Sequence, residues 1–229
     1  MIVIGLTGSI GMGKSTAGAM LEFLGVPIHE SDKAVHEYLN FDSEAWTAIA
    51  AAFPYFSYPQ IYKRKHYFNP FKKTERSLDR GALGKVIFEN DEKREELESI
   101  LHPFVQQSQA RFIKAQQTKG QDIVALDIPL LFETGAEKRV DLVVNISAPA
   151  FIQHARVLAR PNMNEGKLAA ILKRQMPDGE KCVRADYVVH SGLGRGVMMK
   201  ELKHILAEIR KSNTVSKANN EKLRKKVKR

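Results

Sequence analysis

The chain has 229 residues, 43% of them hydrophobic, and carries a formal net charge of +10 at pH 7. This length suits one α/β domain with insertions and a sizeable core. No run approaches 18 apolar residues and the N-terminus lacks the pattern of a signal peptide, so neither a membrane span nor a leader is expected.

Short apolar runs alternate with helical patterns from the first residues onward. Val3–Leu6 is predicted as a buried strand that leads into a glycine-rich turn, and Lys14–Leu24 as a helix that Gly25 ends. A second strand is expected at Val26–Ile28. Two helices follow, one over 31–39 that Ser31 and Asp32 can cap, and one over 42–53.

Residues 54–76 break this pattern with three prolines, seven aromatic residues and a basic cluster. We interpret them as an irregular excursion that takes no part in the sheet. The pattern then resumes, with a proline boundary or kink expected at His102-Pro103. The elements expected after the excursion are helices over 78–88, from 91 past 103, 149–160, 165–175 and 197–211, and strands over 123–127, 140–146 and 187–189.

This order predicts an α/β fold: a parallel, five-stranded sheet flanked by helices on both faces. Sheets of this class bind ligands at the carboxyl ends of their strands. Most of the candidate functional residues lie at such ends.

The segment Gly8-Ser9-Ile10-Gly11-Met12-Gly13-Lys14-Ser15 matches the phosphate-loop pattern G-x-x-x-x-G-K-[ST] in full. The glycines bring backbone N–H groups close to phosphate oxygens, and the following helix directs its positive end at the same anion. Lys14 can reach the β- and γ-phosphates, the Ser15 hydroxyl can bind Mg²⁺, and Thr16 follows. The pattern predicts a bound nucleoside triphosphate. A GTPase-type Asn-Lys-x-Asp and a transporter-type Ser-Gly-Gly-Gln are both absent, which favours a small-molecule kinase.

Asp32 directly follows the second predicted strand, where a kinase needs a carboxylate to take the proton of the acceptor hydroxyl. It could instead only cap the next helix. Arg156 and Arg160 are four residues apart and could close over the triphosphate from one helix face, or form a solvated basic face. Asp127, at the end of the third predicted strand, could hold Mg²⁺ through water or bond to loop amides.

With these residues in place, the sequence resembles the dephospho-coenzyme A kinase family over residues 1 to about 192. Several segments carry the resemblance, and together they are more specific than the loop alone. In chain order they are Leu6–Thr16, Glu30–Asp32, Asp79-Arg80 with Leu83 and Phe88, Leu101–Pro103, Pro129–Glu133, Gln153 with Arg156 and Arg160, Gln175–Pro177 and Ala185–Val189.

The resemblance implies transfer of the γ-phosphoryl group of ATP to the 3′-hydroxyl of dephospho-CoA, with Mg²⁺ required. It implies Asp32 as the base, Arg156 and Arg160 as a lid clamp, and Arg80 and His102 as substrate-binding residues. It also implies one kinase domain over 1–211. Its expected parts are a core (about 1–56, 119–149 and 183–211), a helical substrate-binding insertion (about 57–118) and a lid (about 150–182).

The sequence departs from the family pattern at three places. Glu30 replaces the first acid of Asp-Ala-Asp, although Asp32 is retained. His190-Ser191-Gly192 stands where the family has Asn-x-Gly, which puts an adenine contact in doubt. Residues 55–77 form a longer basic and aromatic segment than the family's compact turn, and we expect a surface insertion with packed aromatics there. Lys63, Arg64 or Lys65 could touch the substrate's pyrophosphate.

The positive charge is concentrated in two segments. Residues 211–229 hold eight Lys or Arg and one acidic residue. Residues 60–76 hold six Lys or Arg and one acidic residue, so the charges of the rest of the chain nearly cancel. Residues 212–229 are expected to be a disordered tail. The sequence therefore predicts no specific nucleic-acid partner, although a nucleotide-dependent nucleic-acid-binding protein and a kinase for another small molecule remain the alternatives. Cys182 is the only cysteine, which fits a cytoplasmic setting. The pattern does not predict an oligomeric state.

Overall fold

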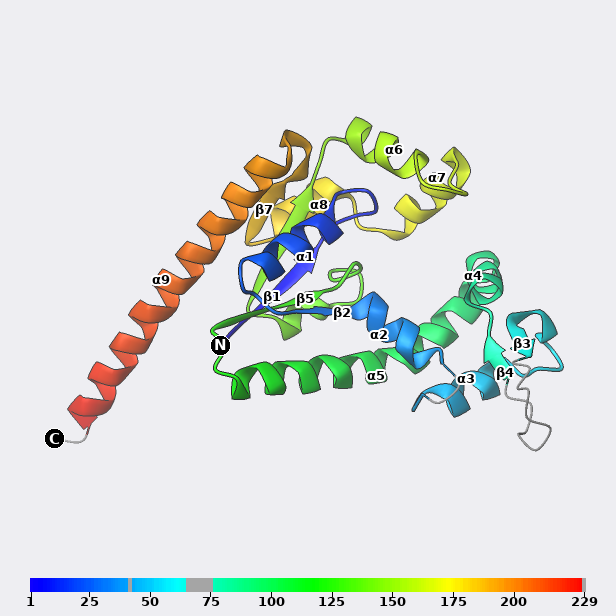
Figure 1. The fold of residues 1–229 in the computed structure, drawn as a ribbon, viewed down its shortest axis with the longest axis horizontal. Helices are drawn as coiled ribbons and strands as arrows, with labels where there is room; N and C mark the ends of the chain where they lie inside the picture. Colours follow the sequence, from blue (N-terminus) through cyan, green and yellow to red (C-terminus); the bar gives the residue numbers. More distant parts are fainter. Residues whose placement is uncertain (41–42, 65–75, 228–229) are drawn as a thin grey trace. The chain divides into compact units, whose positions relative to one another are not determined.

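The computed structural model describes residues 1–40, 43–64 and 76–227. These residues form two compact units (Figure 1). The first consists of Met1–His29 and Ala115–Arg229, and the second of Glu30–Lys114. The second unit begins earlier than the insertion expected from residue 57, and the division into core, insertion and lid stays a prediction. Within the described ranges, no helix is both long and apolar enough to span a membrane.

The first unit is built on a parallel five-stranded sheet with the strand order β2-β5-β1-β6-β7, which confirms the predicted fold class. β1 lies between β5 and β6, with Leu6 opposite Asp127 and Thr7 opposite Asn145. The elements that lie in or enter this unit are β1 (Ile2–Thr7), α1 (Lys14–Phe23), β2 (Ile28–Glu30), β5 (Ile123–Asp127), η2 (Ala136–Arg139), β6 (Leu142–Ser147), α6 (Ala150–Leu158), α7 (Glu165–Arg174), α8 (Asp178–Arg184), β7 (Tyr187–His190), η3 (Ser191–Leu193) and α9 (Arg195–Val227).

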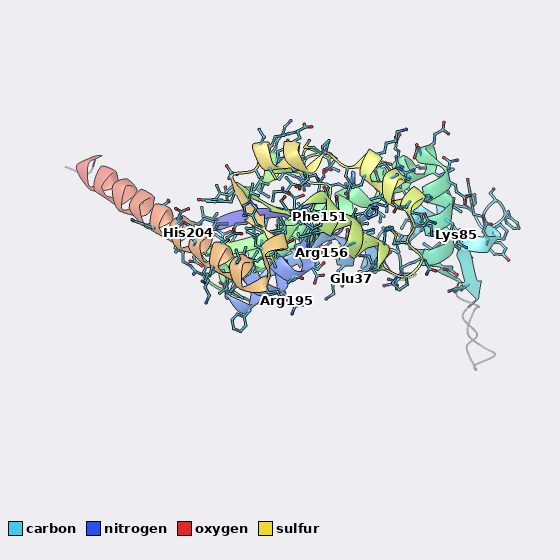
Figure 2. The ribbon with its side chains drawn as sticks, turned by 90° about the horizontal axis from the view of Figure 1, so that it is seen from above. Glu37, Lys85, Phe151, Arg156, Arg195 and His204 are labelled. Atoms are coloured by element: carbon cyan, nitrogen blue, oxygen red, sulfur yellow. The ribbon has the colours of Figure 1, made fainter. Side chains whose placement is uncertain are left out.

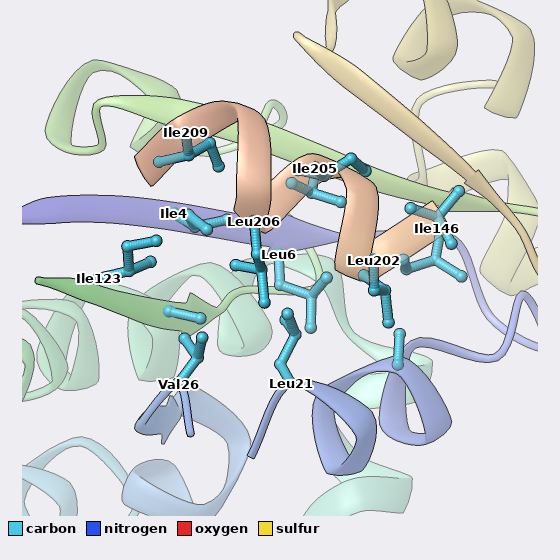
Figure 3. Packing of buried hydrophobic residues seen from close by; sticks show 14 of the residues in the cluster. Ile4, Leu6, Leu21, Val26, Ile123, Ile146, Leu202, Ile205, Leu206 and Ile209 are labelled. Carbon is cyan, nitrogen blue, oxygen red and sulfur yellow. The ribbon is translucent and has the colours of Figure 1, made fainter. Parts of the chain in front are cut away.

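One face of this sheet is covered by α1 and α9. Leu202, Leu206 and Ile209 of α9 point toward the strands, where they meet Ile4 and Leu6 of β1 (Figure 3). All five side chains are at most 3% exposed. Burying such aliphatic side chains contributes roughly 1.5–3 kcal/mol each. This packing fixes the strand that leads into the phosphate loop.

The other face of the sheet packs against the segment that follows β5. Gly5 alternates with Ile4 and Leu6 along β1, and a Cβ built on it would lie 2.5 Å from Cδ1 of Leu131. The segment after β5 can therefore pack closely against β1 only because position 5 is glycine. The helix α8 packs against β6.

Several predicted boundaries in this unit differ from the structure, among them the start of β6, which is Leu142 and not residue 140, and the two that follow. The second strand is Ile28–Glu30, two residues later than expected, because Pro27 has no N–H and joins the neighbouring strand only through its carbonyl, which accepts from Ala125 N at 2.9 Å. The last helix continues to Val227, through the residues from 212 onward that were expected to form a disordered tail. The chain contains no glycine or proline beyond Gly196 to end it.

The second unit is mainly helical and has a separate core. Its central side chains include Ile49, Phe53, Ile61, Leu83 and Leu97, all at most 4% exposed. The elements that lie in or enter it are α2 (Ser31–Tyr38), α3 (Trp46–Ala52), η1 (Pro59–Ile61), β3 (Tyr62–Arg64), β4 (Arg76–Leu78), α4 (Arg80–Glu89) and α5 (Asp91–Thr118).

The excursion expected to be irregular contains a short antiparallel pair, in which Tyr62 of β3 lies opposite Leu78 of β4. Tyr58 and Tyr62 pack against the core of the second unit, as expected for packed aromatics. Lys63 forms an ion pair with Asp79 at 2.9 Å. Three-residue strands are too short to show a period of two in the sequence. Lys65 and the rest of 65–75 lie outside the described residues.

Two helix predictions in this unit need correction. The helix α3 begins at Trp46 and not at residue 42. The N-cap of α2 is Glu30 and no side chain caps that helix; Ser31 is its first helical residue, and its hydroxyl accepts a hydrogen bond from Gln109 Nε2 at 2.9 Å. The long helix α5 continues through Pro103 as predicted, so the helix has no boundary there, and the kink stays a prediction.

Candidate active site

The glycine-rich loop of residues 8–13 joins β1 to α1 at the carboxyl end of β1. Gly11 and Gly13 have left-handed backbone conformations, with φ of 78° and 91°, which favour glycine. A Cβ on Gly11 would also lie 2.6 Å from Cγ2 of Val157 on α6, so the loop can contact that helix only without a side chain there. A loop of this shape before a helix amino end binds phosphate through backbone N–H groups.

The other predicted loop residues are held from within the same unit. A Cβ on Gly8 would lie 2.7 Å from the carbonyl oxygen of Ile146, so β6 passes directly beside the loop. Met12 is 2% exposed, and its Sδ accepts a hydrogen bond from Ala148 N at 3.2 Å. The N–H of Thr16 bonds to the Gly13 carbonyl at 3.0 Å.

Lys14 and Asp127 form an ion pair beside the loop. Lys14 is the first residue of α1 and Asp127 the last of β5, and their side chains are 15% and 13% exposed. The structure thus brings together the cation predicted to reach the phosphates and the carboxylate considered for Mg²⁺.

Residues of the predicted lid bind backbone groups of the loop. Gln153 Nε2 donates to the Ile10 carbonyl at 2.8 Å, and Ile10 N donates to Gln175 Oε1 at 3.0 Å. Arg156 Nη1 lies 3.4 Å from the Gly11 carbonyl, and the same guanidinium bonds to Ser191. Three side chains distant in the sequence therefore converge on one short loop.

Arg156 and Arg160 do not share a helix, which corrects the predicted common face. The helix α6 ends at Leu158, and Arg160 is exposed two residues beyond it (Figure 2 labels Arg156 on α6). Pro161 explains the early end, because a proline disfavours the helical conformation of the residue before it.

The three residues predicted for the acceptor substrate belong to the second unit, whereas the loop belongs to the first. Asp32 is exposed in the first turn of α2, and His102 is exposed on α5. Arg80 is the exposed first residue of α4, whose amino end is capped by Asp79 through the N–H groups of Gly81 and Ala82 at 2.9 and 3.2 Å. The side chains predicted to meet the substrate are thus accessible on the surface of their unit.

Comparison with known proteins assigns the chain to a family. The family model for dephospho-CoA kinase matches residues 2–193. The chain belongs to the dephospho-CoA kinase family. A dephospho-CoA kinase of Mesorhizobium japonicum is 42% identical over 210 residues, which cover 92% of this chain and 98% of the relative. A dephospho-CoA kinase of Brucella melitensis is 46% identical over 189 residues, which cover 82% of this chain and 86% of the relative.

A solved structure extends the similarity to the fold. The dephospho-CoA kinase from Campylobacter jejuni superposes with a TM-score of 0.62 at 26% sequence identity, covering 92% of this chain and 98% of that structure. The resemblance inferred from the motifs is confirmed.

Two side chains of the loop region carry oxygen atoms of the kind that bind Mg²⁺. Ser15 is the second residue of α1 and its side chain is exposed, while Asp127 offers a carboxylate beside Lys14. Mg²⁺ is usually held by one or two protein oxygens together with phosphates and water. The residues that the structure describes contain no cluster of three His, Cys, Asp or Glu side chains that could hold a metal ion.

Two supporting contacts could not be found by reasoning from the sequence. Lys181 of α8 is fully buried and forms an ion pair with Glu133 at 2.8 Å, and the same carboxylate oxygen accepts from Met176 N at 2.7 Å. Ser191, 4% exposed, contacts both Arg156 and the loop. Glu133 stood in a family motif, but an isolated lysine or serine gives no periodic signal. Their roles depend on contacts between distant parts of the chain.

Proposed function

We propose that this protein transfers the γ-phosphoryl group of ATP to the 3′-hydroxyl of dephospho-CoA, producing CoA and ADP. The observation that carries the proposal is the complete phosphate loop, with Lys14 at the start of α1 and a family match over residues 2–193. The family supports the acceptor, and the loop supports the triphosphate donor.

The donor half of the reaction uses the loop and its cation. Residues 11–16 bind the β- and γ-phosphates, chiefly through the N–H groups at the amino end of α1 that have no acceptor within the helix. The Lys14 ammonium exchanges Asp127 for phosphate oxygens and stabilises the charge of the transferring group.

The acceptor half uses Asp32 as general base. The 3′-oxygen forms a bond to the γ-phosphorus while the bond from that phosphorus to the β,γ-bridging oxygen breaks, and the bridging oxygen leaves on ADP. The hydroxyl proton goes to the Asp32 carboxylate, which is exposed for such contact. Arg80 and His102 bind the coenzyme part of the substrate.

Mg²⁺ and the two arginines complete the proposed site. Ser15 and Asp127 would hold Mg²⁺, which would neutralise phosphate charge when bound. Arg156 and Arg160 add positive charge from the lid, residues about 150–182, and lid closure excludes water that would hydrolyse ATP. The remaining parts of the proposal are the core and insertion boundaries given above and a cytoplasmic location.

The direct test is to incubate the purified protein with ATP, Mg²⁺ and dephospho-CoA and to separate the nucleotides by chromatography. Equimolar CoA and ADP are expected, and Lys14→Met should abolish both. ATP binding without CoA formation would refute the acceptor assignment. A parallel screen of other nucleoside and small-alcohol acceptors identifies the true substrate in that case.

A further inference from the structure

Ser191 connects the phosphate loop to the predicted lid through three hydrogen bonds. Its hydroxyl donates to the Met12 carbonyl at 2.5 Å. The two terminal nitrogens of Arg156 donate to the Ser191 hydroxyl at 2.8 Å and to its carbonyl at 2.9 Å. All three residues lie in the first unit. Ser191 therefore binds the loop and α6 at the same time.

The direction of the Ser191 hydrogen bond is determined by Arg156. A serine hydroxyl has one hydrogen and two lone pairs, whereas a guanidinium can only donate. Because the hydroxyl accepts from Arg156, its single hydrogen is free to be directed at the Met12 carbonyl. The residue before it is also anchored, since His190 N donates to Glu201 Oε2 of α9 at 2.7 Å.

The bond to the Met12 carbonyl has a consequence on the opposite side of the loop. A trans peptide is planar, so the Met12 carbonyl and the Gly13 N–H point in opposite directions. Holding the carbonyl on one side therefore aims the N–H to the other side. In the same way, the bond of Gln153 to the Ile10 carbonyl orients the N–H of Gly11. These N–H groups belong to the part of the loop that binds phosphate.

We propose that Ser191 is a positioning residue for nucleotide binding, which acts through the Met12–Gly13 peptide and together with Arg156. It does not touch the nucleotide. The inference rests on the proposed function, because it assigns a role in the binding of ATP. The close fit at Gly13 agrees with it: a Cβ there would lie 3.1 Å from both Cβ and Oγ of Ser191.

The deciding experiment is calorimetric titration of Ser191→Ala with Mg·ATP in the absence of dephospho-CoA. Losing the hydroxyl leaves the Met12 carbonyl without this donor, so we expect the Kd for ATP to rise about tenfold. Ser191→Thr keeps the hydroxyl and should bind within about threefold of the parent protein. The matched control is Ser99→Ala at an exposed site of α5. It removes a hydroxyl that donates to the Glu96 carbonyl, and it should leave the Kd unchanged.

Two further measurements separate positioning from a purely structural role. In steady state, the KM for ATP should rise in Ser191→Ala while the KM for dephospho-CoA stays the same. The double variant Arg156→Ala/Ser191→Ala should bind ATP more tightly than the product of the two single effects predicts, because the residues act as a unit. A folded Ser191→Ala that binds ATP within twofold of the parent protein, or more tightly, overturns the proposal. The titration contains no dephospho-CoA. Its result therefore tests the role of Ser191 even if the protein does not form CoA.

Discussion

Lys14 and Asp127 form an ion pair at the carboxyl end of the central strands, with both side chains largely withdrawn from solvent. In the proposed site, a triphosphate must replace Asp127 as the partner of Lys14. We propose that the Asp127 carboxylate would then help to hold Mg²⁺. Asp127 would in this way link the charge of the empty site to that of the loaded site.

This exchange predicts how Asp127→Asn alters the Mg²⁺ dependence of ATP binding. Without Mg²⁺, the neutral side chain neither competes for Lys14 nor repels phosphate, so ATP should bind about fivefold more tightly than to the parent protein. With Mg²⁺, the variant should gain no affinity, because it loses an oxygen that serves the metal. Titrations with ATP in EDTA and in excess Mg²⁺ measure both values.

The matched control for that experiment is Asp122→Asn. Asp122 directly precedes β5, at the other end of the same strand, and pairs with Arg210 at 3.0 Å. It should change neither titration. An Asp127→Asn protein whose affinities with and without Mg²⁺ shift equally would contradict the proposed exchange.

The proposed base is tested by Asp32→Asn. The amide keeps the shape of the side chain but cannot take the hydroxyl proton, so kcat should fall by about a hundredfold or more. The Kd for ATP should stay within about twofold, because the loop is unchanged. Glu37→Gln, an equivalent change at an exposed site of the same helix, should leave kcat unaltered. Near-normal turnover of Asp32→Asn would remove it from the base role.

The shape of the phosphate loop was predictable because its signals are local. The apolar run of β1, the glycines of the loop and the lysine that starts α1 lie within fourteen residues, and each specifies backbone shape or charge directly. The fold class followed from the alternation of such runs with helical patterns. The strand shift at Pro27 shows the limit of this reasoning, because an apolar run does not say where pairing begins.

The supports of the site were not predictable, because they depend on tertiary contacts. Ser191 and Met12 are 179 positions apart, and nothing near either residue indicates that they meet. Arg156 was found by its motif, yet its contact with Ser191 was not. In the sequence, Lys181 looks like a solvated lysine in a short charged segment, and only the folded chain shows that it is fully buried.

Lys181→Met tests the buried ion pair with Glu133. Removing the ammonium leaves a largely buried carboxylate without its charge partner, which should lower the free energy of unfolding by about 3 kcal/mol. The double variant Lys181→Met/Glu133→Gln should recover part of this loss, since glutamine is neutral and still accepts from Met176 N. Denaturant titration measures each change. Lys138→Met, at an exposed site, should stay within about 0.5 kcal/mol, and an equally small effect of Lys181→Met would refute the pair's importance.

The cap of α4 predicts a pH dependence of stability. A hydrogen bond from Lys63, followed by one from the Ala82 N–H, lowers the pKa of Asp79 below its ordinary value. A lowered pKa means that the stabilising effect of Asp79 is complete above its unfolded pKa of about 3.9 and is lost as pH falls through the lower folded value. Asp79→Asn should therefore unfold at a lower denaturant concentration than the parent protein at pH 7.

The difference between the two proteins should shrink as the pH falls below about 4, where the parent carboxyl also becomes neutral. Denaturant midpoints at a series of pH values measure it. Lys63→Met should reduce the pH dependence in the parent background, because Lys63 is the main cause of the shift. A stability difference that is constant from pH 7 to pH 3 would show that the carboxylate charge plays no part.

Truncation after Lys211 removes the basic C-terminal segment, residues 212–229. Among the side chains that the structure describes on α9, the last one in the core is Ile209, which is 3% exposed. The shortened protein should therefore keep its unfolding midpoint and its rate of CoA formation within about twofold. By contrast, Ile209→Ala should cost about 2 kcal/mol or more of stability. Seven Lys or Arg residues are lost with the deleted segment, so any binding to RNA or DNA should weaken with salt in the full chain and disappear on truncation. If the folded, truncated protein lost CoA formation instead, the basic end would belong to the enzyme's own site.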